Sequence, residues 1–170
     1  MVSIRLAGID LEIILLIYAG FTDIAARVIS NVTCLLLAAL GIANQMLLAN
    51  PWQFGMSLGV AACMFLALLF VHSRGSIGGG DDKLLTAISI GLPAIAVMQF
   101  LTLTVLAGGV LALVHLLLRL LPYPAPPPVG SSLVHRVYAI ERWRTLRRAP
   151  LPYGVAIACG GIWTLLAHGA

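Results

Sequence analysis

Three aspartates are the residues best suited to chemistry in this chain. Asp81 and Asp82 lie side by side in GGGDDK, residues 78–83, between two strongly apolar stretches, and Asp23 lies in TDIAARVISN, residues 22–31. Two carboxyls brought together cannot both ionise easily, so they share a proton. Such a pair can activate a water for attack on an amide, because the ionised member accepts the water's proton while the other hydrogen-bonds or protonates the carbonyl oxygen. This chemistry needs no metal and no cofactor.

Each aspartate also has a purely structural explanation. Asp23 could pair with Arg27 four residues later on a helix. Asp81 or Asp82 could cap a helix that begins near Leu84, but a cap accounts for one aspartate and not for two behind three glycines. A glycine-rich turn before a helix can also hold a phosphate, but two carboxylates would repel one. A shared acid–base role explains the pattern better than a phosphate site does.

The other acids and the metal-ligand residue types have simpler explanations. Asp10 and Glu12 lie near the outer end of the first apolar stretch, at the level expected for lipid headgroups, and Glu141 lies among arginines. The histidines are widely separated, and the three cysteines form no CxxC pair. The sequence therefore predicts no metal site.

Composition identifies the class of protein. Of 170 residues, 61% are hydrophobic and 9% are charged, with a mean hydropathy of +1.04. Soluble domains are about half apolar and about a quarter charged, so the chain is expected to be an integral membrane protein. The net charge of +4 comes with no nucleic-acid-binding motif. We predict an all-α, polytopic membrane protein forming one domain over residues 1–170.

Apolar length predicts six transmembrane helices. Residues 84–121 lack a polar divider, but one straight helix of that length would reach about 57 Å, far more than a hydrocarbon core of about 30 Å. We therefore predict two passes with a tight turn at Gln99–Thr102, the first of them kinked by Gly91 and Pro93. The predicted spans are 6–22, 31–49, 55–72, 84–99, 102–121 and 152–168.

The distribution of basic residues predicts the orientation. With the N-terminus outside, in the periplasm, only Arg5 lies outside, and the aspartates Asp23, Asp81 and Asp82 face the cytoplasm. The Pro-rich and basic segment 122–150 is then a cytoplasmic loop, which either only fixes the topology or includes an interfacial helix on anionic lipid. The cytoplasmic basic residues are Arg27, Arg74, Lys83, Arg119, Arg136, Arg142, Arg144, Arg147 and Arg148.

At these aspartates the sequence resembles the prepilin peptidases, membrane aspartic proteases of the GxGD class, and among them the short Flp/Tad-type members. Residues 78–81 match the GxGD signature, and Lys83 matches its GxGDxK continuation. The segment TDIAARVISN is similar to the first-aspartate motif, although Ser30 stands where proline is usual. LPYGVAIACG, residues 151–160, is similar to the last-helix motif. The matching residues of the first-aspartate motif are Asp23, Arg27, Ile29 and Asn31.

The resemblance implies a GxGD aspartyl protease-like bundle in a bacterial inner membrane, with Asp23 and Asp81 as the catalytic pair. Its substrates would be prepilins with a short basic leader, cut at the cytoplasmic face, in support of a pilus or secretion machinery. Asp82 occupies the variable position of the motif, so a helix-cap or supporting role is expected. Without CxxC pairs, peptidase activity without methyltransferase activity is expected.

Further residues receive roles from this resemblance. Gly78 and Gly80 would let an extended substrate backbone approach the aspartate, and Lys83 would anchor the loop at the headgroups. Tyr153 and Gly154 are candidates to line the site. Arg27 and Asn31 are assigned supporting roles, and membrane lipids are the expected surroundings.

Two other classes of protein remain to be weighed. A small transporter or channel could use Asp23 and Asp81 as proton or cation sites, but no inverted repeat is visible, and the acids lie near one face rather than at mid-membrane. A non-catalytic subunit of a secretion machine would be expected to have lost its acids, whereas the GxGDxK signature is intact.

Overall fold

The computed structural model describes residues 2–48, 50–75, 78–120, 132–133, 139 and 151–169. Within them the chain forms six helices and no strand, which confirms the all-α prediction. Most of the predicted loop 122–150 lies outside the described residues. The helices are α1 (Val2–Ala26), α2 (Asn31–Leu48), α3 (Pro51–Ser73), α4 (Gly79–Gly91), α5 (Ala94–Leu120) and α7 (Tyr153–Gly169).

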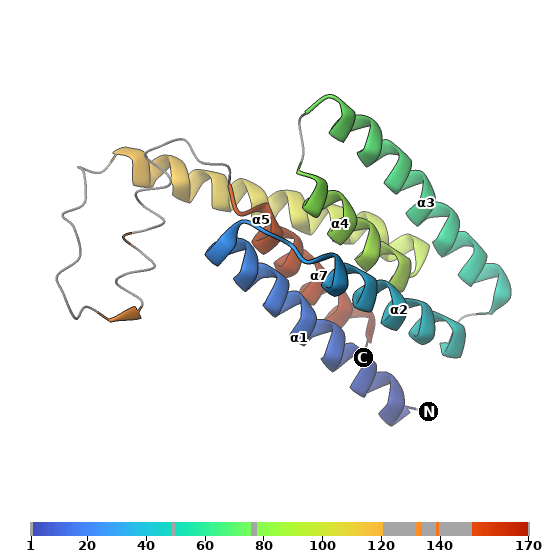
Figure 1. Cartoon of the computed structure of the whole chain (residues 1–170). Helices are drawn as coiled ribbons and strands as arrows, with labels where there is room; N and C mark the ends of the chain where they lie inside the picture. Colours follow the sequence, from blue (N-terminus) through green and yellow to red (C-terminus); the bar gives the residue numbers. More distant parts are fainter. Residues whose placement is uncertain are drawn as a thin grey trace.

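Successive helices run in opposite directions (Figure 1). The end of α1 and the beginnings of α4 and α7 lie toward one end of the bundle, and both chain termini lie toward the other (Figure 1). We call the first the aspartate end, because Asp23, Asp81 and Asp82 lie there. We call the second the Glu12 end, because it holds a buried glutamate described below.

Helix α4 is the shortest of the six and lies at the centre. It packs against α2, α3 and α7, while α1 and α5 both pack on α7. Leu84, Leu85 and Ile88 of α4 are buried in the main apolar core. At its far end α4 crosses α2 with backbone against backbone, because a Cβ placed on Gly41 would lie 2.5 Å from the Cα of Gly91. Both glycines are therefore needed for this crossing.

The turn predicted at Gln99–Thr102 is wrong, because these residues lie inside α5. The chain instead leaves α4 after Gly91 and begins α5 at Ala94. Pro93 explains the position: it offers no N–H to a helix and disfavours a helical conformation at the residue before it. Leu92 accordingly has extended backbone angles, φ −98° and ψ 145°. The predicted reversal of direction within 84–121 is present, but it occurs where only a kink was predicted.

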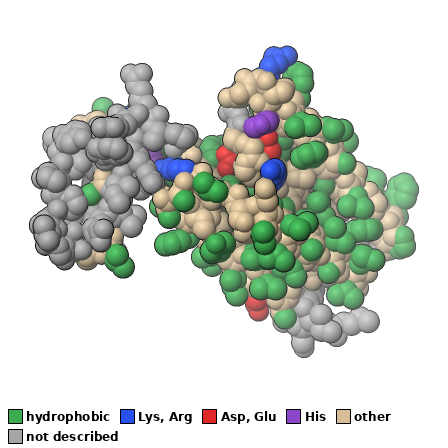
Figure 2. All heavy atoms as spheres, in the orientation of Figure 1, with side chains coloured by type: hydrophobic (Ala, Val, Ile, Leu, Met, Phe, Trp, Pro, Cys, Tyr) green, Lys and Arg blue, Asp and Glu red, His purple; other side chains and the backbone are tan. Residues whose placement is uncertain are grey.

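Two helices, Pro51–Ser73 and Ala94–Leu120, are long and apolar enough to cross a membrane by length and composition. Asn31–Leu47 and Tyr153–His168 are apolar but shorter. Large apolar side chains cover much of the visible surface (Figure 2). Charged side chains gather instead at the junction of α3 and α4 (Figure 2). Six membrane crossings remain a prediction.

Candidate active site

Asp23 is placed by the way α1 ends. The helix stops at Ala26, and Arg27 adopts a left-handed backbone conformation with φ 56°. That conformation is uncommon for a residue other than glycine and is often found at functional sites. The Arg27 N–H still donates to the Asp23 carbonyl oxygen at 3.0 Å. Asp23 therefore lies in the last turn of α1, and it is only 6% exposed.

The beginning of α7 holds the Asp23 carboxylate. The Gly154 N–H donates to Asp23 Oδ2 at 2.8 Å, and a backbone N–H in the first turn of a helix is a good donor for a carboxylate. A Cβ on Gly154 would lie 2.9 Å from the same oxygen, so only glycine fits without displacement. The sequence proposed Gly154 as a residue that lines the site, and the structure gives it a direct contact with Asp23.

Asp81 and Asp82 occupy the first turn of α4. Both of their backbone N–H groups donate to the Gly78 carbonyl oxygen, at 3.1 and 3.3 Å, and Gly78 itself is extended. Carboxylates are stabilised at this position by the helix dipole. Asp81 is partly exposed, whereas Asp82 is only 4% exposed. The candidate site thus contains two acids from α4 and one from α1.

The charges of these acids interact. Burial, followed by the charges of Asp23 and then Asp82, raises the pKa of Asp81 from 3.8 to about 6. Asp23 and Asp81, 58 positions apart in the chain, are therefore close enough for one charge to influence the other. A carboxyl with such a pKa retains its proton into mildly acidic solution and can act as a general acid.

His72 is a neighbour that the sequence analysis missed. Its Nδ1 lies 3.4 Å from Asp82 Oδ2. Burial raises the pKa of Asp82, and the charge of His72 opposes that rise. In the sequence, His72 is one of several widely separated histidines. Only the return of the chain from α3 into α4 brings His72 to Asp82.

A hydrogen bond joins the GGGDDK segment to the segment TDIAARVISN. Lys83 Nζ donates to Asn31 Oδ1 at 2.9 Å, which links the first turn of α4 to the first residue of α2. Lys83 thus binds a protein group, and the predicted supporting role of Asn31 stays a prediction. Whether Lys83 also contacts lipid headgroups stays a prediction.

The glycines of the GGGDDK segment face neighbouring side chains. A Cβ on Gly80 would lie 3.2 Å from Ile29 Cβ, and one on Gly78 would lie 3.3 Å from Asp81 Oδ2. Close packing of α4 on the α1–α2 loop is therefore sufficient to explain Gly80. The predicted role of Gly78 and Gly80 in substrate approach remains untested.

Tyr153, the other residue expected to line the site, points toward α5. Its hydroxyl would lie 2.7 Å from a Cβ placed on Gly108. Its role as a lining residue stays a prediction. Within the described residues, no group of three or more His, Cys, Asp or Glu side chains could hold a metal ion. The arrangement is suited to proton transfer between carboxyls.

Comparison with known proteins identifies relatives. The profile of the type IV leader peptidase family matches residues 11–113, a range that contains all three aspartates. The prepilin leader peptidase/N-methyltransferase of Bacillus subtilis (strain 168) is 28% identical over 168 residues. That match covers 97% of this chain and 57% of the relative, so the chain spans little more than half the relative's length. No solved structure matches the chain.

Proposed function

The chain belongs to the type IV leader peptidase family, and we propose that it is a membrane aspartic endopeptidase that removes leader peptides from prepilins. Asp23 and Asp81 are the proposed catalytic pair. The observation that carries the proposal is that the charge of Asp23, on α1, helps to raise the pKa of Asp81, on α4, at one end of the bundle. The family makes prepilin processing the expected reaction.

The two carboxyls have different surroundings, which suggests different roles. Asp23 is held by the Gly154 N–H, an interaction that suits an ionised carboxylate acting as general base. Asp81, with its pKa raised to about 6, suits the protonated member of the pair. In this assignment a proton passes from water to Asp23, and another passes from Asp81 to the substrate carbonyl oxygen.

In the proposed reaction Asp23 accepts a proton from water as the water oxygen bonds to the scissile carbonyl carbon. Asp81 donates its proton to the carbonyl oxygen, which gives a neutral tetrahedral diol. The proton on Asp23 then passes to the amide nitrogen, and the carbon–nitrogen bond breaks. One diol hydroxyl returns its proton to Asp81 as the carboxylic acid product forms. The products are the leader acid and the new amino terminus, and both aspartates regain their starting states.

A basic leader is the substrate that the resemblance to prepilin peptidases implies. Asp23, Asp81 and Asp82 lie at the aspartate end together with Arg27, Arg74 and Lys83, so local charge alone does not select it. The bias of basic residues supports a location of this end at the cytoplasmic face of the inner membrane, with the N-terminus in the periplasm. A Flp/Tad-type pilus or a related secretion machinery is the proposed destination of the processed pilin.

A cleavage assay tests the proposal. The full chain, purified in a neutral detergent, is incubated with a prepilin that has a basic leader, and the products are identified by mass spectrometry. Asp23→Asn and Asp81→Asn should each reduce cleavage by about 10³-fold or more, since the pair acts as a unit. Asp10→Asn removes an exposed carboxyl from α1 and should cleave normally. Normal cleavage by either dyad variant would overturn the assignment, and ion flux without cleavage would favour a transporter.

A further inference from the structure

A second polar site lies at the Glu12 end of the bundle. A cavity of about 460 Å³ opens where the chain breaks between α4 and α5, and side chains of α1, α2, α3, α5 and α7 complete it. The volume falls within the range of about 300–1,000 Å³ typical of small-molecule sites. Glu12 precedes Asp23 by 11 residues of α1, or about 16 Å along the helix. The cavity is therefore separate from the aspartate pair.

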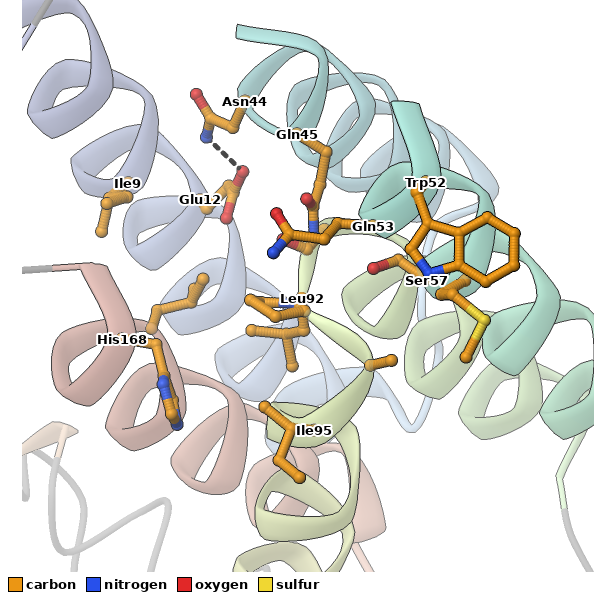
Figure 3. A pocket seen from close by; sticks show the side chains of 15 residues that line it. Ile9, Glu12, Asn44, Gln45, Trp52, Gln53, Ser57, Leu92, Ile95 and His168 are labelled. Carbon is orange, nitrogen blue, oxygen red and sulfur yellow. Dashed lines mark hydrogen bonds between the residues drawn. The ribbon is translucent and has the colours of Figure 1, made fainter. Parts of the chain in front are cut away.

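The carboxyl and carboxamide groups of the cavity come from three helices. Glu12 is 4% exposed, and its Oε1 accepts a hydrogen bond from Asn44 Nδ2 at 2.8 Å. Gln45 is 6% exposed and donates to the Gly91 carbonyl oxygen at 3.3 Å, while Gln53 extends from α3 into the same space (Figure 3). Three helices thus direct carboxylate or carboxamide groups toward one point above Leu92 (Figure 3).

The contact between Glu12 and Asn44 depends on a close helix approach. A Cβ on Gly8, one turn before Glu12, would lie 2.5 Å from Asn44 Oδ1. Only a glycine at that position leaves room for the Asn44 side chain beside α1. The position of the glutamate–asparagine pair is therefore specified by both helices.

The charge of the cavity has one sign. Its described lining residues contain one carboxyl, Glu12, and no lysine or arginine. His168, the other titratable lining residue, has its Nε2 2.7 Å from Gln99 Oε1, and its ring points away from Glu12 (Figure 3). A buried carboxylate is best matched by a cation that also donates hydrogen bonds. The cavity is therefore complementary to an ammonium group.

The remaining walls are apolar and reach the surface. Leu92 and Leu165 are buried in the cavity wall, whereas Trp52 is 78% exposed and Ile95 is 82% exposed. A hydrocarbon chain leaving the cavity would pass along Trp52 or Ile95, and its burial would favour binding. An ion without an apolar part would make no use of these walls.

We propose that this cavity binds a primary ammonium group carried on a hydrocarbon tail, with the ammonium donating to Glu12 and the carboxamide oxygens around it. The ammonium headgroup of a membrane phospholipid is one source, and a free amine is another. The site lies outside the proposed catalytic reaction and does not depend on it.

Binding is measured by native mass spectrometry of the full chain in a neutral detergent. Phosphatidylethanolamine should be retained, whereas its N-acetyl form, which keeps the tails but loses the charge, should bind about tenfold less or worse, the loss expected for one charge-assisted hydrogen bond. Free ethanolamine competes in a separate arm: displacement of the lipid by ethanolamine would identify the ammonium group alone as sufficient. Equal retention of the two lipids would overturn the proposal.

Two variants test whether the lipid ammonium group binds at Glu12. Glu12→Gln keeps an oxygen that accepts from Asn44, so the fold is preserved while the charge is lost, and it should reduce retention of phosphatidylethanolamine to the level of the N-acetyl lipid. Asp10→Asn is the matched control, because it removes an exposed carboxyl from the same helix, and it should bind normally. Equal loss in both variants, or in neither, would show that Glu12 serves only as the partner of Asn44.

Discussion

The two ends of the bundle bury carboxyls in opposite ways. At the aspartate end, acids from α1 and α4 come close enough for the charge of Asp23 to raise the pKa of Asp81, and a backbone N–H of α7 holds Asp23. In the cavity at the Glu12 end, the one acidic lining residue lies among carboxamides, and one of them, from Asn44, donates to it. All of these acids lie in a largely apolar bundle. The difference between the two ends therefore lies in the groups that neighbour each acid.

This difference determines what each end can do. Acids that repel one another hold a proton between them and can transfer it, which is the property required for amide hydrolysis. A buried acid with no second acid beside it is neutralised either by a proton or by a bound cation, which suits it to binding a cation. The comparison predicts that the ends differ in location, in tolerance of displacement and in response to pH.

The largest expected difference is in location. We expect a reporter active only in the cytoplasm to work when fused after Arg74, at the aspartate end, and one active only in the periplasm to work when fused near Pro51, at the Glu12 end. These outcomes are all-or-none, because α3 joins the two positions and is long enough to cross the membrane. The same reporter response at both positions would contradict the assignment of the ends to opposite faces.

The next largest effect is expected from a displacement of the Asp23 carboxylate. Gly154→Ala places a Cβ 2.9 Å from Asp23 Oδ2, so the carboxylate must move. A displacement of about 1 Å can reduce a reaction rate by about 10²-fold, and we expect a loss of that size in prepilin cleavage with little change in the amount of folded protein. The measurement is cleavage per folded molecule in detergent.

Gly109→Ala is the control for this prediction. It makes the same change in α5, where a Cβ would meet no atom within 4 Å, and it should cleave normally. Equal activity of the two variants would mean that the Gly154 contact does not position a catalytic group.

The position of the three aspartates at one end could be predicted from sequence alone. Helices of similar length that alternate in direction return the end of α1 and the beginning of α4 to the same side, whatever the detailed packing. The boundary between α4 and α5 could not be predicted by length. Apolar length favoured a turn near Gln99, but the local constraint of Pro93 outweighed the length argument.

Contacts between helices that are distant in the sequence also could not be predicted. The motif around Gly154 marked it as a candidate site residue, but its N–H contact with Asp23 depends on how α7 packs. The His72 ring lies beside Asp82 because of how α3 packs, and His72 has no local signal in the sequence. Glu12 was predicted to lie among headgroups, because an acid near the end of an apolar stretch is commonly found there. The structure buries it instead, because Gly8 lets α2 approach and bring Asn44 within hydrogen-bonding distance.

A smaller effect is expected at Gly80, where two explanations compete. If Gly80 only allows close packing, Gly80→Val should lower the yield of folded protein, because its Cβ would lie 3.2 Å from Ile29. Removing the neighbouring Cβ in the double variant Gly80→Val with Ile29→Gly should then restore the yield of folded protein, as expected for residues in contact. If Gly80 admits the substrate, turnover per folded molecule should fall and remain low in the double variant. Cleavage normalised to folded protein separates the two outcomes.

The smallest expected effect is a shift in pH dependence. Asp81 must be protonated in the proposed reaction, so cleavage should be present below its pKa of about 6 and be lost as pH rises through that value. Asp82→Asn removes the smallest of the three causes that raise this pKa. The pKa of Asp81 should therefore fall, and the alkaline limb of the cleavage profile should move to lower pH by less than about one unit. The variant should remain active at its optimum, since Asp82 takes no part in proton transfer.

The raised pKa of Asp81 also determines how the free energy of unfolding changes with pH. Because the folded pKa of Asp81 lies above its ordinary value of 3.8, the folded protein binds this proton more tightly than the unfolded chain does. The Asp81 contribution to the free energy of unfolding is therefore present at low pH and declines as pH rises from about 4 to about 6. Because the pKa of Asp82 is also raised by burial, Asp81→Asn should reduce that decline in thermal melts without removing it, and Asp10→Asn, at the other end of the bundle, should leave it unchanged. A decline of unchanged size in Asp81→Asn would assign it to other groups and leave Asp81 without the raised pKa that its role as general acid requires.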